Sequence, residues 1–130
     1  MKSLKILATN ESPSVNFNPD EGRFLITGNS MPENAVDFYQ EIKEWLNHYI
    51  ESPKPENEFI FQMNLLNTSS TKLFADIFKL INKLAEKVKA KITWYYNHGD
   101  EDIQEIGTDF KGLSQVQFDL VPLDNNDPIT

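Results

Sequence analysis

The feature that most constrains the fold is the alternation of strand-like and helix-like apolar patterns between residues 59 and 96. Residues 59–66 and 92–96 are short apolar runs, rich in aromatic and aliphatic side chains, as buried strands require. Between them, apolar residues recur at helical spacing, at positions 73, 77, 80, 81, 84 and 88. A helix that joins two strands of one sheet makes them parallel, with both carboxyl ends at the same edge. This unit predicts a layered α/β fold.

The N-terminal segment predicts three further strands. Residues 4–8 form a short apolar run. Residues 15–17 and 24–26 flank an Asn-Pro-Asp-Glu-Gly sequence at 18–22, which is a turn signal. These two strands are therefore expected to form a hairpin.

A first helix is expected from residues 31–34 onward. Pro32 suits a first helical turn, which needs no amide hydrogen from it, and Glu33 suits the positive end of the helix. The apolar residues that follow, at 35, 38, 42, 45, 46, 49 and 50, lie on one face. We expect this face to be buried.

The C-terminal half completes a single domain. Residues 52–57 contain two prolines and predict a connection, 100–112 a short helix or turn, and 116–121 a final strand. The order β-β-β-α-β-α-β-(α)-β predicts an α/β domain over residues 1–123, with helices packed on a mixed sheet. This arrangement resembles STAS-type domains. The polar residues 124–130 predict a flexible tail.

Composition excludes several classes of function. The chain has 130 residues, 20 Asp and Glu against 12 Lys and Arg, and a formal charge of −8. Such a charge repels phosphate backbones and anionic membranes, so neither nucleic acid nor a membrane surface is an expected partner. No apolar run approaches ~18 residues, so we expect no membrane insertion. With no cysteine and no recognisable leader, the chain is expected to be a soluble cytoplasmic protein.

The most unusual stretch is Asn67-Thr68-Ser69-Ser70-Thr71, immediately before Lys72 and the second helical stripe. One interpretation is helix capping, because Ser and Thr accept hydrogen bonds from the free amides of a first turn. One cap needs only one hydroxyl, however, and four are present. A helix start also tolerates an added phosphate. A phosphoacceptor site is therefore the functional alternative.

A second candidate is the acidic sequence Asp100-Glu101-Asp102. A solvated loop is the plain interpretation, and His98 with Asp100 and Asp102 lacks the spacing of known zinc or calcium motifs. The chain has no phosphate-binding glycine loop and no nucleophile motif, so we expect neither an enzyme nor a cofactor or metal. If 59–66 and 92–96 are parallel, this sequence and Thr68 lie at one edge and form a composite docking surface.

The motifs together resemble the SiaC-type regulatory phosphoproteins of bacteria. The matching stretches are Ser12-Pro13-Ser14-Val15-Asn16-Phe17, Gly28-Asn29-Ser30-Met31-Pro32-Glu33-Asn34-Ala35 with Phe38-Tyr39, Asn67-Thr68-Ser69-Ser70 with Lys72, and Trp94-Tyr95-Tyr96 with Asp100-Glu101-Asp102-Ile103, Glu105 and Gly107. They run from about residue 9 to 121. Met31 stands where the family often has an aromatic residue.

The resemblance implies a STAS-like adaptor in bacterial signalling. A dedicated protein kinase would phosphorylate Thr68, with Asn67, Ser69, Ser70 and Lys72 as its surroundings, and a PP2C-type phosphatase would reverse the modification. The unphosphorylated form would bind a target such as a diguanylate cyclase and so control cyclic-di-GMP and biofilm formation. The residues expected to contact partners are Pro32, Glu33, Asn34, Tyr39, Asp100, Glu101 and Asp102.

Two other functions remain open from the residues alone. One is a small-molecule-binding STAS-like module without phosphoregulation, with a pocket between the first helix and the sheet. The other is an enzyme that uses Asp100, Asp102 and Glu105, which would need a carboxyl group with a strongly raised pKa in a cleft.

Overall fold

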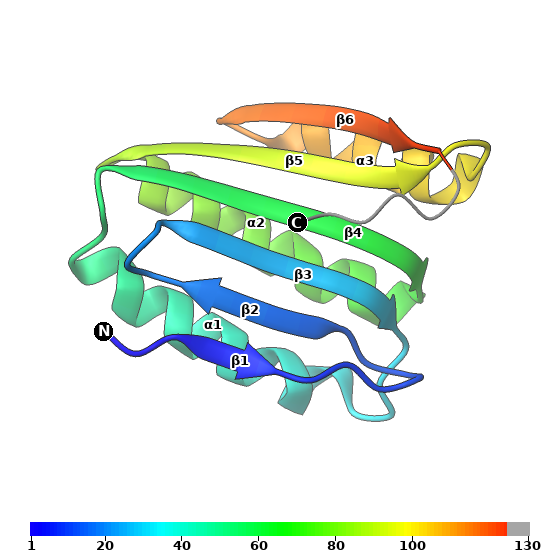
Figure 1. The fold of residues 1–130 in the computed structure, drawn as a ribbon, viewed down its shortest axis with the longest axis horizontal. Helices are drawn as coiled ribbons and strands as arrows, with labels where there is room; N and C mark the ends of the chain where they lie inside the picture. Colours follow the sequence, from blue (N-terminus) through cyan, green and yellow to red (C-terminus); the bar gives the residue numbers. More distant parts are fainter. Residues whose placement is uncertain (125–130) are drawn as a thin grey trace.

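The computed structural model describes residues 1–124 and shows six strands and three helices in that range. The elements, shown in Figure 1, are β1 (Leu4–Ile6), β2 (Ser14–Asn18), β3 (Arg23–Ser30), α1 (Ala35–Glu51), β4 (Glu56–Leu66), α2 (Thr68–Ala85), β5 (Lys89–Asn97), α3 (Glu101–Leu113) and β6 (Gln117–Leu123). The tail expected over 124–130 lies outside the described residues from position 125 onward.

The six strands form one mixed sheet in chain order, β1-β2-β3-β4-β5-β6. β1 and β2 are antiparallel, as are β2 and β3, which confirms the predicted hairpin. From β3 to β6 every neighbouring pair is parallel, and the four arrowheads point the same way in Figure 1. The edge where these four strands end, at Ser30, Leu66, Asn97 and Leu123, is called the carboxyl edge below.

All three helices lie on the same side of the sheet, behind it in Figure 1. The order of the strands explains this. Each helix connects one parallel strand to the next, every connection steps in the same direction along the sheet, and such connections are almost always right-handed. Right-handed connections that step in one direction place every helix on one face. The mixed α/β architecture predicted from the sequence is confirmed.

Aromatic residues fill the space between the helices and the sheet. The buried face of β5 alternates as the strand period requires: Ile92, Trp94 and Tyr96 point inward. The Trp94 ring lies 5.8 Å from that of Phe61 in β4 and 5.7 Å from that of Phe110 in α3. Both helical stripes predicted from the sequence lie against this core.

Strand β4 begins earlier than the sequence pattern predicts. The connection expected over 52–57 ends sooner, because the parallel register with β5 starts at Glu56 opposite Lys89. Asn57 is buried there, and its side-chain amide donates to the carbonyl oxygens of Lys54 (2.9 Å) and Lys89 (3.0 Å). These hydrogen bonds satisfy a polar side chain that the sequence pattern assigns to a solvated loop.

Helix α1 begins later than predicted. Its N-cap is Asn34, whose side-chain oxygen accepts from the Asp37 amide at 3.2 Å, and the first helical residue is Ala35. Pro32 and Glu33 therefore precede the helix, and the prediction that Pro32 lies in its first turn is wrong. An Asn cap satisfies a free amide, which a proline two residues earlier does not.

Candidate functional site

The start of helix α2 is arranged around Asn67 rather than around a hydroxyl. Asn67 is the N-cap: its side-chain oxygen accepts from the Ser70 amide at 2.9 Å, and the Ser69 hydroxyl donates to the same oxygen at 3.2 Å. Thr68 is the first helical residue. The helix therefore begins four residues before Lys72, and capping is done by the amide side chain in place of Ser or Thr.

The four hydroxyl groups of this stretch have different surroundings. The Ser69 hydroxyl is bonded to the cap, Ser70 is fully buried, and the Thr71 hydroxyl donates to the Thr68 carbonyl at 2.7 Å. Thr68 is exposed, and within the described part of the chain its hydroxyl has no hydrogen-bond partner. Thr68 is therefore the hydroxyl in this stretch that solvent and another protein can reach without breaking a hydrogen bond.

Beneath Thr68 lies a chain of buried hydroxyl groups that joins three elements. Ser30 ends β3, Tyr39 lies in the first turns of α1, and Ser70 follows Thr68 by two residues; all three are fully buried. The Ser30 hydroxyl contacts both the Tyr39 phenol and the Ser70 hydroxyl, the latter at 2.8 Å. The start of α2 is thereby tied to the end of β3 and to α1.

The direction of each hydrogen bond in this chain follows from counting hydrogens. Ser70 donates its hydrogen to the backbone carbonyl of Ser30 at 3.0 Å, because a carbonyl only accepts. Ser30 must then donate to Ser70, and Tyr39 must donate to Ser30. Burial raises the pKa of Tyr39 far above its ordinary value, and the hydrogen bonds with Ser30 and Ser70 lower it only in part. The phenol is therefore neutral and remains a donor at physiological pH.

A hollow of about 660 Å³ lies between the beginnings of α1 and α2. Its lining is contributed by both helix starts: Glu33, Asn34, Ala35, Val36, Thr68, Ser69, Lys72 and Leu73. The sequence-predicted Glu33 and Asn34 are thus next to Thr68, and Lys72 shares the same hollow. Pro32 lies half-buried in the loop before α1. Tyr39 is in the interior, so any effect of Tyr39 on a partner is indirect.

The acidic sequence is a helix start rather than a loop. Asp100 caps α3, its carboxylate accepting from the Ile103 amide at 3.1 Å, and Glu101 and Asp102 are exposed in the first turn. Because β4 and β5 are parallel, this start and that of α2 lie at the same carboxyl edge, as predicted. The Asn97 amide donates to the Asn64 oxygen at 3.3 Å and joins the two strand ends. The lining of the Thr68 hollow, however, comes from α1 and α2 and not from α3.

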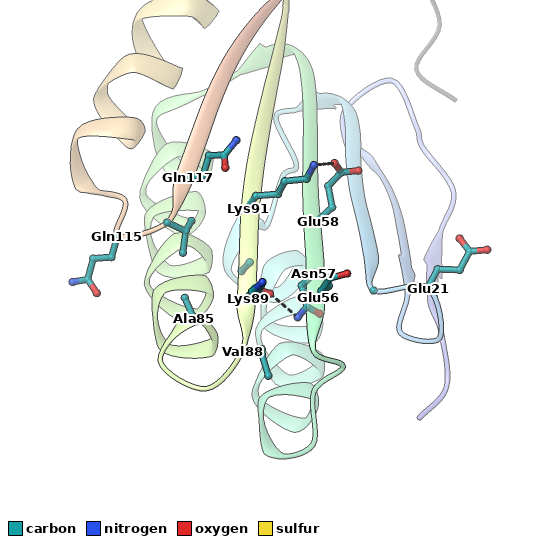
Figure 2. Close-up of a pocket in the computed structure, with 13 residues that line it drawn as sticks. Glu21, Glu56, Asn57, Glu58, Ala85, Val88, Lys89, Lys91, Gln115 and Gln117 are labelled. Carbon is teal, nitrogen blue, oxygen red and sulfur yellow. Dashed lines mark hydrogen bonds and ion pairs between the residues drawn. The ribbon is translucent and has the colours of Figure 1, made fainter.

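A second hollow, of about 720 Å³, lies at the opposite edge, where β4, β5 and β6 begin (Figure 2). Two of its charged groups are paired with each other: the Lys91 ammonium lies 3.1 Å from the Glu58 carboxylate. The space between α1 and the sheet, where a ligand pocket was an alternative prediction, is filled by buried side chains that include Ile42 and Leu46. These features give a small-molecule site no specific support.

Within residues 1–124, no group of three or more His, Asp or Glu side chains is placed to hold a metal ion, and His98, Asp100 and Asp102 form no such group. No helix in residues 1–124 is long and apolar enough to cross a membrane.

Sequence reasoning missed Ser30. The signal was present in the two-residue period of β3, because Phe24, Ile26 and Ser30 share the buried face of that strand. A hydroxyl at an inward position must find a buried partner, and none is visible in the neighbouring sequence. The partners come from α1 and α2, so only the tertiary structure identifies them.

Known proteins share this fold. The structure of SiaC from Pseudomonas aeruginosa has a TM-score of 0.87, 22% sequence identity, and coverage of 95% of this chain and 100% of the other. The structure of the diguanylate cyclase SiaD in complex with its activator SiaC, also from P. aeruginosa, gives a TM-score of 0.86 with 23% identity, covering 92% of this chain and 99% of the matched chain. At these identities the likeness concerns the fold.

Sequence comparison establishes the family. An uncharacterized protein of P. aeruginosa (strain UCBPP-PA14) is 25% identical over 112 residues, which is 85% of this chain and 89% of that protein. Residues 6–123 match the family model described as "SiaC family regulatory phosphoprotein". That match extends from β1 to the end of β6 and includes the Thr68 hollow and the buried hydroxyl chain. The chain belongs to the SiaC family of regulatory phosphoproteins.

Proposed function

We propose that this protein is a signalling adaptor whose binding to a target protein is switched by phosphorylation of Thr68. The observation that carries the proposal is the unpartnered, exposed Thr68 hydroxyl at the first position of α2. A kinase can approach this hydroxyl without disrupting the helix, because Asn67 supplies the cap. Membership of a family of regulatory phosphoproteins supports the same role.

A phosphate on Thr68 would alter the hollow without unfolding the helix. It adds a charge of about −1.5 to −2 beside free amides and the positive end of the helix dipole, where an anion is stabilised by about 0.3–1 kcal/mol. Lys72 lies one helical turn further along, in reach of a side chain at Thr68, whereas Glu33 lines the hollow from the other side. The modification therefore attracts Lys72 and repels Glu33. The surface around Thr68 therefore changes in charge and in shape, and a target that fits the neutral hydroxyl no longer fits it.

The proposed partners are a dedicated protein kinase, a PP2C-type phosphatase and a target, which we infer to be a diguanylate cyclase. A related protein of the same fold, SiaC of P. aeruginosa, is the activator of the cyclase SiaD and forms a complex with it. We place the protein in the bacterial cytoplasm, with a binding role and no catalysis of its own. Regulation of a cyclase would connect it to cyclic-di-GMP and biofilm formation.

Site mapping tests the first step of this proposal. The protein is incubated with the cognate kinase and ATP, and the modified residue is located by mass spectrometry. We expect phosphate on Thr68, none on a Thr68→Ala variant, and undiminished modification of Thr71→Ala. Thr71 is a suitable control because its hydroxyl is already bonded to a backbone carbonyl. Phosphate on Thr71 or Ser69, with Thr68 unmodified, would contradict the assignment.

A further inference from the structure

Helix α2 is the basic member of an otherwise acidic layer of helices. It lies between α1 and α3 (Figure 1), and each of these two neighbours carries four acidic side chains and one lysine. Helix α2 carries three lysines and one aspartate, in a protein whose formal charge is −8. The positive charge of the helix layer is thus concentrated on its central helix.

The three lysines of α2 form a stripe along one face of the helix. Lys72 and Lys79 are two helical turns apart and Lys83 follows one turn later, so the three share a face over about 16 Å. All three are exposed. Asp76 lies between them, but the ammonium group of Lys43 in α1 is 3.4 Å from its carboxylate. The lysine stripe (Lys72, Lys79 and Lys83) therefore keeps a net positive charge.

A hollow of about 350 Å³ lies between α1 and α2, beside the lysine stripe. Its lining consists of Lys43, Asn47, Asp76, Lys79, Leu80 and Lys83. Within residues 1–124, no ion pair or hydrogen bond involves the ammonium groups of Lys79 and Lys83. Leu80 is half-buried and adds an apolar side chain. The hollow therefore offers a partner two unpaired cations next to an apolar surface.

We propose that the lysine stripe is a docking surface for an acidic segment of the target protein, a stretch of chain with aspartate or glutamate beside an apolar side chain. The inference rests on the proposed function and deepens it by naming a surface and the chemistry of its partner. The carboxylates of the segment would face the three lysines, and its apolar side chain would enter the hollow beside Leu80.

The acidic neighbours of α2 limit the width of the occupant. Packed helices lie about 8–10 Å apart, so the carboxylates of α1 and α3 flank the lysine stripe on both sides. All eight of these acidic side chains are exposed. A membrane surface or a nucleic-acid duplex would cover all three helices and meet them, and like charges repel. A single narrow acidic segment that follows α2 avoids both flanks.

The lysine stripe reaches the candidate phosphorylation site at one end. Lys72 lines the hollow of Thr68, whereas Lys79 and Lys83 line the hollow between α1 and α2. A phosphate on Thr68 would attract the ammonium group of Lys72 and add negative charge beside it. The acidic segment would then lose its contact with Lys72 and be repelled at that end. The stripe thus gives phosphorylation an electrostatic means of weakening the bound target.

The inference is tested by reversing charge at the end of the stripe that lies away from Thr68. The double variant Lys79→Glu/Lys83→Glu is compared with the wild type for affinity to the cognate diguanylate cyclase by calorimetry. The matched control, Lys5→Glu/Lys54→Glu, changes the net charge equally, in β1 and in the connection before β4. All four lysines are exposed, so the fold is expected to be retained. A neutral variant, Lys79→Gln/Lys83→Gln, keeps the test decisive if the reversed charges destabilise α2.

We expect the charge-reversed variant to bind the cyclase about tenfold or more weakly, the neutral variant to lie between, and the control to bind like the wild type. Added salt should weaken binding of the wild type more than that of the neutral variant. Phosphorylation of Thr68 by the kinase is measured on every variant. If phosphate on Thr68 releases the cyclase but the reversed variant binds normally, the inference fails while the proposed function stands. If reversal impairs phosphorylation and leaves cyclase binding intact, the kinase is the occupant and the inference is overturned.

A second measurement applies if the cyclase does not bind the wild type. The probe is a peptide of about 12 residues, rich in glutamate and with two leucines; its twin has glutamine in place of glutamate, and a single-stranded RNA serves as a different polyanion. NMR should show the glutamate peptide shifting the signals of Lys79, Leu80 and Lys83 but not Lys54, and the glutamine peptide shifting none. Equal shifts from both peptides, tighter binding of the RNA at the stripe, or self-association that the charge reversal abolishes would overturn the inference.

Discussion

The substitution Tyr39→Phe isolates the buried hydroxyl chain from the rest of the core. It removes one oxygen and keeps the ring, which packs 5.5 Å from that of Phe74. Tyr39 donates to Ser30, so the variant loses that hydrogen bond, while Ser30 still donates to Ser70. The cost is one net hydrogen bond plus one unfilled acceptor position in a dry interior, together about 1–3 kcal/mol of unfolding free energy.

The chain contains a matched control for this change. Tyr49 is also buried in α1, and its phenol donates to the Asn57 side chain and accepts from the Lys54 amide at 3.1 Å. Tyr49→Phe therefore loses one buried hydrogen bond, to Asn57, and one from the backbone amide of Lys54, an exposed residue whose amide water can reach. Its cost is therefore comparable, but it falls near the end of α1 that lies farthest from Thr68. The two variants separate a general loss of stability from a specific effect at the candidate site.

The assay is hydrogen exchange, compared with the unfolding free energy from denaturant titration. We expect both variants to be destabilised by similar amounts, within about 1 kcal/mol of each other. Only Tyr39→Phe should accelerate exchange of the amides from Ser70 to Lys72 and slow the phosphorylation or binding reactions at Thr68. Equal exchange in these amides for the two variants would refute the conclusion that the hydroxyl chain holds the start of α2 in place.

The titration of Tyr39, the cap at Asn67 and the close packing of Gly107 each affect stability in a way that can be measured. The pKa of the Tyr39 phenol is raised in the folded protein, so above pH about 10 the unfolded chain loses this proton first. The free energy of unfolding therefore falls as the pH rises, by up to about 1.4 kcal/mol per pH unit. In alkaline denaturation, the unfolding free energy of the Tyr39→Phe variant should decline less steeply with pH. Asn67→Ala should lower the free energy of unfolding by about 0.5–2 kcal/mol, and Thr68→Ala by less than about 0.5 kcal/mol, because Asn67 is the cap. A larger loss for Thr68→Ala than for Asn67→Ala in thermal unfolding would contradict the capping assignment. Gly107→Ala should lower the unfolding free energy by about 1–3 kcal/mol, because a Cβ there would overlap the Trp94 ring. An unchanged denaturation midpoint would show that α3 moves away from Trp94 without cost.

The fold was predictable where the pattern of side chains is long and periodic. The stripe through Leu73, Ile77 and Leu84 lies between two apolar runs, and this pattern predicted the parallel β4-α2-β5 unit that sets the carboxyl edge. The starts of the helices were less predictable. Proline and hydroxyl residues were plausible first-turn and cap residues, but Asn34 and Asn67 perform the capping. Several residues near a helix start can serve as the cap, and the surrounding tertiary contacts decide which one does.

The site was predictable in part. The neighbours of Thr68 and the family resemblance both point to this residue. The structure adds a physical distinction among the four hydroxyls, because those of Ser69 and Thr71 are bonded locally. The closeness of Glu33 to Thr68 depends on the packing of α1 against α2. No periodicity in the sequence indicates that Glu33 and Thr68 lie beside the same hollow. The same is true of Ser30, whose partners come from two different helices.

The role of Thr68 as a switch is tested by the affinity of the target for the protein in two states, with and without the phosphate. The wild type is phosphorylated to completion on Thr68, verified by intact mass, and its binding to the cognate cyclase is compared with that of the unmodified protein. A Thr68→Ala variant exposed to the same kinase serves as the control. We predict that phosphorylation weakens binding by at least about tenfold and that the variant retains wild-type affinity after the same treatment. Equal affinity of the phosphorylated and unmodified proteins would contradict the proposal that Thr68 is the switch.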